Sequence, residues 1–226
     1  MKADHRSAVA AQRREKMRAR LIETAVTVVA AQGIEGTVID DIVKAAGVSR
    51  GTFYNHFVDV PALIVAARDA LIEECLVLSL TEVADVADPA EACARGLRVA
   101  LAISAAHPML ARFSARTGFN VLQRCNLMAA LLPPILEHGM REGRFGAVPV
   151  QLAVDLLAGV MAVGLQYQAG GVDFDDTTLI AAALRMLAME EKEALRLASL
   201  PVARVTPPES GLIARSALAP TLDPSE

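Results

Sequence analysis

Residues 37–57 decide the fold, and they read TVIDDIVKAAGVSRGTFYNHF. Two short helices are predicted here, because Gly47 suits the position after a helix and Ser49 suits the cap that opens the next one. Thr37 is predicted to cap the first of them. Gly47 permits a tight turn, so the pair forms a helix-turn-helix. The apolar residues that would lock the two helices together are Ile42, Val43, Ala46, Val48, Phe53 and Phe57.

The second helix, predicted over Arg50–His56, presents polar or small side chains outward. A helix of this kind lies in the major groove of DNA with its first residues near the base edges. Arg50 suits a contact with guanine, and Gly51 leaves room for the backbone to approach the bases. The hydroxyl groups of Thr52 and Tyr54 and the imidazole of His56 suit contacts with phosphate. Asn55 suits either role. The predicted DNA-contacting set is Thr37, Ser49, Arg50, Gly51, Thr52, Tyr54, Asn55 and His56.

The composition and the periodicity of the rest of the chain predict an all-α protein. Of the 226 residues, 54% are apolar but only 4% are aromatic, which favours packed amphipathic helices over a sheet. A first helix runs from Met17 to Gly33, where apolar residues recur at helical spacing. Further helices are predicted at 61–80, 90–106, 109–117, 120–138, 150–168 and 176–199.

The charge is distributed unevenly along the chain. The net charge of −4 would by itself count against a nucleic-acid partner. Residues 1–20, however, hold seven basic and two acidic side chains, a local charge of +5, while residues 61–226 carry a charge of −6. Such a basic end is typical of a segment that approaches phosphate, although a solvated, disordered terminus would have the same composition.

Several other classes of protein are not indicated. Three cysteines without a CxxC pair favour a reducing cytoplasm, and no apolar segment typical of a secretion signal follows the N-terminal charges. Residues 156–172 are uncharged, but they fit a buried helix better than a membrane span. The phosphate-binding, dinucleotide-binding and nucleophile motifs are missing, and the four histidines lack metal-ligand spacing, so we expect no enzyme, no cofactor and no metal site.

The sequence resembles the TetR-type transcriptional regulators. The resemblance is carried by the apolar first helix and by T-x-x-D-D-I-V-K-A-A-G-V-S-R-G-T-F-Y-N-H-F from Thr37, and it is close over residues 17–60. It implies a homodimer that binds a near-palindromic double-stranded DNA operator, with a small-molecule effector bound in the helical body. The helices at 150–168 and 176–199 are the expected dimer interface. One departure is Val60, which stands where the family commonly has a phosphate-contacting lysine.

The effector pocket is implied by the resemblance alone, with a lining from 61–80, 90–106, 109–117 and 120–138. An aliphatic or acyl-type effector suits such an apolar lining slightly better than a large planar cation. Polar candidates for the pocket are His107, Arg112, Arg116, Gln166 and Tyr167, although each also has an ordinary structural explanation.

These observations predict four regions: a basic flexible arm (1–13), a helix-turn-helix DNA-binding domain (14–60), a helical effector-binding and dimerisation domain (61–200) and a disordered tail (201–226). The predicted function is a cytoplasmic, ligand-responsive repressor. The alternatives are an activator of the same fold and an all-α ligand-binding or adaptor protein that has lost DNA binding.

Overall fold

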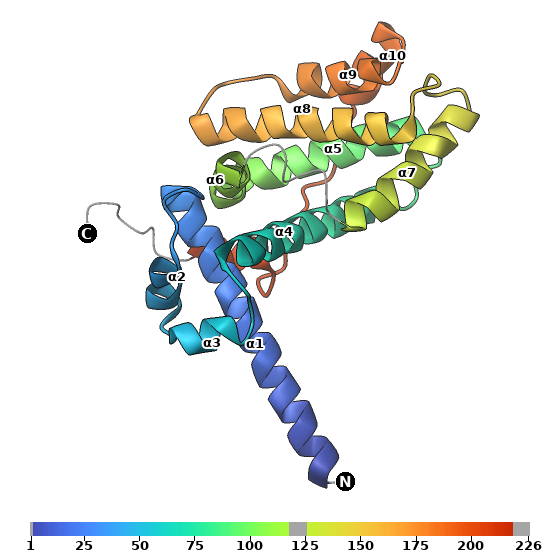
Figure 1. Ribbon diagram of the computed structural model, residues 1–226. Coiled ribbons are helices and arrows are strands. Elements are labelled where there is room, and N and C mark those ends of the chain that lie inside the picture. Colours follow the sequence, from blue (N-terminus) through green and yellow to red (C-terminus); the bar gives the residue numbers. More distant parts are fainter. Residues whose placement is uncertain (1, 118–125, 219–226) are drawn as a thin grey trace.

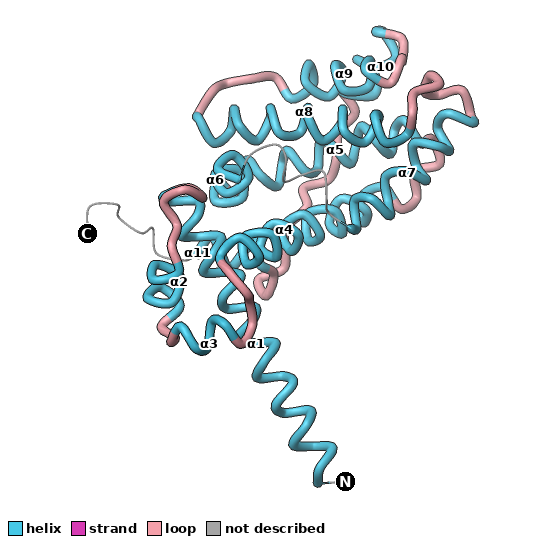
Figure 2. The backbone as a smooth tube through the Cα atoms, viewed as in Figure 1, coloured by secondary structure: helices cyan, strands magenta, loops and turns pink. Residues whose placement is uncertain are grey.

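Helices are the only regular secondary structure in residues 2–117 and 126–218, which are the residues that the computed structural model describes (Figure 2). The predicted all-α fold class is confirmed. Figure 1 shows α1–α3 gathered at one end of the molecule and a layered helical body at the other.

The N-terminal domain is formed by three helices: α1 (Lys2–Gln32), α2 (Ile39–Ala46) and α3 (Arg50–Tyr54). The apolar stripe of α1 is fully buried, and it packs in one core with Ile42 of α2 and Phe53 of α3. Residues 2–13, predicted as part of a flexible arm, form the first turns of α1. These turns are rich in alanine and arginine, which favour a helix, and they extend away from the bundle (Figure 1).

The described part of the body contains seven helices. They are α4 (Val60–Val83), α5 (Pro89–Ala106), α6 (Pro108–Thr117), α7 (Asn126–Arg141), α8 (Val150–Gly170), α9 (Asp176–Met186) and α10 (Glu191–Ala198). Most predicted segments are found within a few residues of these bounds. The exception is 176–199, which the structure divides into α9 and α10 around Ala188, a residue with a left-handed φ of 59°. Of the predicted helix at 120–138, residues 120–125 lie outside the described residues.

A second hydrophobic core joins α5, α7, α8, α9 and α10. By length and composition, α8 is the one described helix that is apolar enough to cross a membrane. Core helices of globular proteins have the same character, and α8 packs against α5, α6, α7 and α9. Gly164 of α8 permits this packing, since a Cβ there would lie 2.7 Å from Leu101 of α5 and 2.9 Å from Leu179 of α9.

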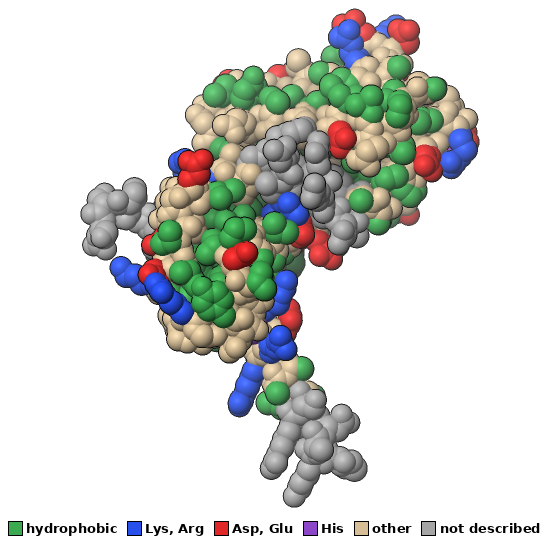
Figure 3. All heavy atoms as spheres, in the orientation of Figure 1, with side chains coloured by type: hydrophobic (Ala, Val, Ile, Leu, Met, Phe, Trp, Pro, Cys, Tyr) green, Lys and Arg blue, Asp and Glu red, His purple; other side chains and the backbone are tan. Residues whose placement is uncertain are grey.

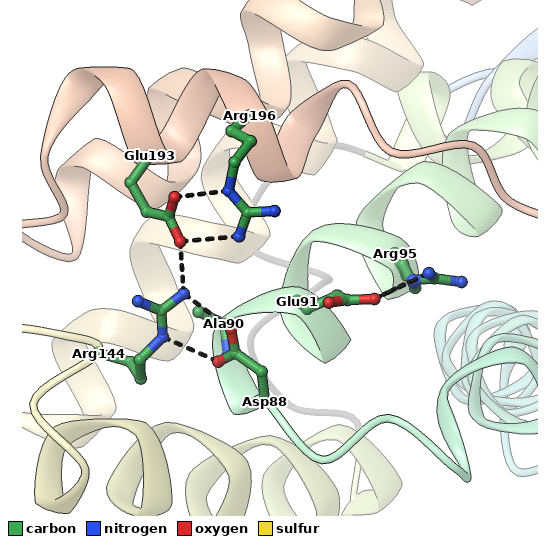
Figure 4. Close-up of polar contacts among 7 residues, drawn as sticks. All are labelled: Asp88, Ala90, Glu91, Arg95, Arg144, Glu193 and Arg196. Atoms are coloured by element: carbon green, nitrogen blue, oxygen red, sulfur yellow. Dashed lines mark hydrogen bonds and ion pairs between the residues drawn. The ribbon is translucent and has the colours of Figure 1, made fainter.

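An ion-pair network closes the end of the body that lies away from α2 and α3 (Figure 4). Arg144, in the loop after α7, lies 2.7 Å from both Asp88 at the start of α5 and Glu193 of α10. Arg196 binds the same glutamate at 2.7 Å. Hydrogen bonds from Arg196 and then Arg144 lower the pKa of Glu193 to about 2. The network therefore links three segments that are far apart in the sequence.

The predicted disordered tail at 201–226 is wrong for residues 201–218. An additional helix, α11 (Leu212–Leu218), packs against α1, α4 and α6 and buries Leu212 and Ile213. The carboxylate of Glu74 in α4 accepts hydrogen bonds from the backbone N–H groups of both residues, at 2.6 and 3.2 Å. Residues 219–226 lie outside the described residues.

Candidate nucleic-acid interface and effector cavity

The turn between α2 and α3 has the predicted geometry. Gly47 follows α2 with a left-handed φ of 62°, and its N–H donates to the carbonyl of Lys44. A Cβ at this position would also lie 3.2 Å from the guanidinium of Arg20 in α1. Any other residue would therefore be strained in its backbone and crowded by α1.

Ser49 caps α3 as predicted. Its Oγ accepts a hydrogen bond from the N–H of Thr52 at 3.1 Å and lies 3.0 Å from the hydroxyl of the same threonine. Both hydroxyls are therefore engaged within the helix-turn-helix, which fixes the direction of the first turn of α3.

Helix α3 ends at Tyr54, two residues earlier than predicted. Its outward face, together with Asn55 and His56 that follow it, consists of groups for which the fold has little use. Tyr54 is 59% exposed, although its ring contacts Phe53 edge to face. Gly51 and Asn55 are exposed as well. His56 is half-buried, and its Nδ1 has no hydrogen-bond partner among the described residues.

Arg50, the first residue of α3, pairs with Asp40 of α2. Its Nε donates to Oδ1 at 2.7 Å and its Nη2 donates to Oδ2 at 2.5 Å. The hydrogen bonds from Arg50 lower the pKa of Asp40, and both side chains are well exposed. Sequence reasoning missed Asp40, because the two residues lie ten positions apart on different helices.

Thr37 does not have the predicted position. It is only 7% exposed, and its hydroxyl donates to the carbonyl of Gly33 at 2.6 Å. The cap residue of α2 is Val38, whose N–H donates to the carboxylate of Asp41. Val38 is 55% exposed next to the start of α2, so the structure presents an apolar side chain where the sequence suggested a hydroxyl.

The basic residues of α1 have two different environments. Arg13, Arg14 and Lys16 are exposed, whereas Arg18 is half-buried with its guanidinium 5.3 Å from the ring centroid of Phe57. Figure 3 shows Lys and Arg side chains along this part of α1 and beside α2 and α3. The local positive charge predicted from the sequence therefore lies at the same end of the molecule as the exposed face of α3.

The start of α4 explains Asp59, the residue next to the departure from the family pattern at Val60. Asp59 caps α4 by accepting a hydrogen bond from the N–H of Ala62 at 2.7 Å. Val60 begins the helix and packs against the N-terminal core. A valine side chain supplies no positive charge at this position.

The body contains a cavity of about 160 Å³ between α4, α5, α6, α7 and α8. Among the described residues, its lining is almost entirely aliphatic and includes no charged side chain. The polar groups are the hydroxyls of Ser79, Ser104 and Ser114 and two thiols. Burial raises the pKa of Cys75 and Cys93 to about 12, so both thiols are neutral near pH 7.

The cavity corrects the predicted lining in two respects. Helix α8 contributes apolar side chains to the wall, whereas the sequence suggested only two polar residues of this helix. The five polar candidates are wrong as cavity residues, because none of them lines it; they are His107, Arg112, Arg116, Gln166 and Tyr167. Of these, the two arginines, the glutamine and the tyrosine are exposed. The serines were missed because a hydroxyl on an aliphatic helix face has no distinctive spacing.

A helix-turn-helix with an exposed polar second helix, joined to a helical body that contains an apolar cavity, defines a ligand-responsive DNA-binding transcriptional regulator. Residues 21–67 match the family described as bacterial regulatory proteins, tetR family. The chain is 31% identical to the regulator RolR, solved in complex with resorcinol, with a TM-score of 0.70 over 87% of this chain and 100% of that one. It belongs to the TetR family of transcriptional regulators.

More distant solved structures share the fold. A TetR family transcription regulator from Marinobacter aquaeolei VT8 is 23% identical, with a TM-score of 0.60 over 82% of this chain and 97% of that one. FadR from Bacillus subtilis in complex with stearoyl-CoA is 19% identical, with a TM-score of 0.58 over 80% of this chain and 97% of that one. No curated protein sequence matches the chain.

Proposed function

We propose that the protein is a dimeric cytoplasmic repressor that binds a near-palindromic operator through α3 and releases it when a small molecule fills the cavity. The observation that carries DNA binding is the face of α3, where exposed Tyr54 and Asn55 and a half-buried His56 have little role within the fold. Repression is inferred from the usual behaviour of the family.

The predicted contact residues fall into two groups under this proposal. Arg50, Gly51, Tyr54 and Asn55 are exposed and face the duplex, where the arginine suits guanine and the others suit phosphate or close backbone approach. His56 offers its second ring nitrogen to phosphate. Ser49 and Thr52 hold the first turn of α3 in place, and Thr37 supports the preceding turn from inside.

Dimerisation is assigned to the outer face of α8 and α9. Leu152, Val163 and Tyr167 of α8 and Met186 of α9 are each more than two fifths exposed. Figure 3 shows hydrophobic side chains spread over these two helices, on the side away from α2 and α3. An apolar face of this extent is typical of a protein–protein interface. Gly164 of α8 does not belong to this face, because it serves packing within the chain.

The cavity favours a compact, uncharged effector. Its 160 Å³ resembles an engineered apolar cavity of about 150 Å³ that stays dry and binds benzene. An aliphatic lining without charged groups disfavours an ionised ligand, while three serine hydroxyls can orient one or two polar substituents. Because the similar regulator RolR was solved with resorcinol, we propose a monocyclic phenol rather than the aliphatic or acyl-type effector that the expected lining slightly favoured.

A mobility-shift assay on the DNA flanking the protein's own gene tests DNA binding. Wild type should retard a specific fragment, and the double variant Arg50→Ala, Tyr54→Ala should not. Absence of binding to any DNA at low salt would exclude the regulator and favour the adaptor function. Transcription in vitro from the bound promoter distinguishes a repressor, which lowers transcript yield, from an activator.

The cavity is tested by Gly96→Leu, since Gly96 lines it and a Cβ there meets no atom within 4 Å. Resorcinol at a hundred times its dissociation constant should stabilise wild type by about 2.7 kcal/mol in a thermal-shift assay and should release the DNA. Gly96→Leu should remain folded and lose both responses. Ala105→Leu, on the exposed side of α5, is the matched control and should keep them. An unchanged response of Gly96→Leu would show that the effector binds elsewhere.

A further inference from the structure

The Asp40–Arg50 pair contributes little that the fold requires. Helices α2 and α3 are already joined through buried Ile42, Ala46 and Phe53. Ion pairs exposed to solvent contribute a median of about 0–1 kcal/mol to stability. Both side chains of this pair are about three fifths exposed, so the pair needs an explanation other than packing.

The geometry of the pair leaves part of the guanidinium available. Asp40 accepts from Nε and Nη2, which form one edge of the planar group. The guanidinium has five N–H donors, so the end formed by Nη1 and the second proton of Nη2 remains open. This end can donate two parallel hydrogen bonds to O6 and N7 of guanine, the most common base-specific contact of arginine.

We propose that Asp40 is a positioning residue that holds Arg50 ready for a guanine and thereby sets the base preference of the operator at that position. The inference rests on the proposed DNA-binding function. An arginine side chain carries about 2 kcal/mol of rotamer entropy, and the carboxylate restricts that freedom before DNA arrives. The lowered pKa of Asp40 keeps the carboxylate charged near pH 7.

The carboxylate of Asp40 has a second effect, which is to lower the affinity of the protein for DNA, including DNA that lacks the correct guanine. Asp40 is an exposed negative charge next to the surface that approaches the phosphates, so it weakens binding to every sequence. Its removal should therefore increase binding to random DNA and decrease discrimination at one base pair. A residue with a merely structural role would change affinity for all sequences alike.

The test uses the full-length protein and an operator selected from random-sequence DNA. Dissociation constants are measured for this operator and for single-base variants in both half-sites. Arg50→Ala should lower discrimination at one guanine about 5- to 150-fold, the range expected for a bidentate contact worth about 1–3 kcal/mol. Asp40→Ala should lower discrimination at the same guanine at least about threefold and leave the other positions unchanged, because it removes only part of that contact.

Two further variants make the outcome decisive. Glu35→Ala removes one exposed negative charge from the same domain without touching Arg50 and should raise affinity for random DNA without altering base preference. The double variant Asp40→Ala, Arg50→Ala should have the base preference of Arg50→Ala alone. The proposal is overturned if Asp40→Ala keeps the wild-type preference, or if the selected operator shows no preference for guanine that depends on Arg50. Failure of wild type to select any sequence would instead refute the DNA-binding function itself.

Discussion

Replacing Gly51 with alanine should make the protein more stable and a weaker DNA binder. Gly51 lies in the first turn of α3 with an ordinary helical backbone, unlike Gly47. A Cβ there would meet only the Oγ of Ser49, at 3.7 Å, which is a normal van der Waals contact. No contact among the described residues therefore requires glycine at this position.

The two effects have different physical origins. Alanine in a helix is more favourable than glycine by roughly 0.5–1 kcal/mol, which corresponds to a Tm increase of about 1–4 °C for a chain of this size. On DNA, the added methyl group would lie between α3 and the base edges. Overfilling a packed contact costs about 1–3 kcal/mol, so affinity should fall by about 5- to 150-fold for each half-site that is bound.

Thermal denaturation and fluorescence anisotropy on a labelled operator measure the two effects separately. Gly96→Ala is the matched control, because a Cβ at Gly96 of α5 also meets no obstacle and α5 lies in the body, away from α3 (Figure 1). It should raise the Tm and leave operator affinity unchanged. Wild-type affinity in Gly51→Ala would refute the close approach of α3 to the bases, and a lowered Tm would refute the assignment of free space at Gly51.

Two predictions concern the body. Ile213→Ala should lower the free energy of unfolding by about 2–5 kcal/mol in denaturant titration, because Ile213 is buried. Thr206→Ala is the control, since Thr206 is exposed, and it should change the free energy of unfolding by less than about 0.5 kcal/mol. Negligible effects of both substitutions would contradict the packing of α11. The pKa of Glu193 is about 2, held below its ordinary 4.5 by Arg196 and Arg144, so its stabilising contribution is present above pH 4.5 and is lost as the pH falls toward 2. The Tm advantage of wild type over Glu193→Gln should shrink over that interval, and a difference independent of pH would contradict the ion-pair network.

The sequence was sufficient to predict a structural feature wherever the residues that determine it are close together in the chain. Gly47 and Ser49 act through their own backbone and through residues within four positions of them, so the turn and the α3 cap could be predicted. The apolar stripe of α1 gave the N-terminal core for the same reason. Thr37 shows the limit of such reasoning, because its neighbour Val38 takes the cap position while the threonine hydroxyl bonds back to α1.

Features that depend on distant residues could not be predicted. Helix α11 is held by Glu74, which lies 138 positions earlier than the first N–H that it accepts from. The break at Ala188 has no glycine or proline to mark it, and Gly146 from another loop donates to the carbonyl of Leu187 beside it. The cavity results from the arrangement of five helices in space, and the residue pattern of any one of these helices does not predict it.

In the helix-turn-helix, the residues that stabilise the domain can be distinguished from the residues that remain available for contact with DNA. Thr37, Ser49 and Thr52 use their hydroxyls within the domain, so their substitution alters α3 before any DNA is bound. Gly51 and Tyr54 have no comparable internal use, and selection for folding alone would not favour an exposed tyrosine or a helical glycine. Under the proposed function, the second group carries recognition and the first makes it possible. Arg50 belongs to both groups, because one edge of its guanidinium is held by Asp40 and the other remains open.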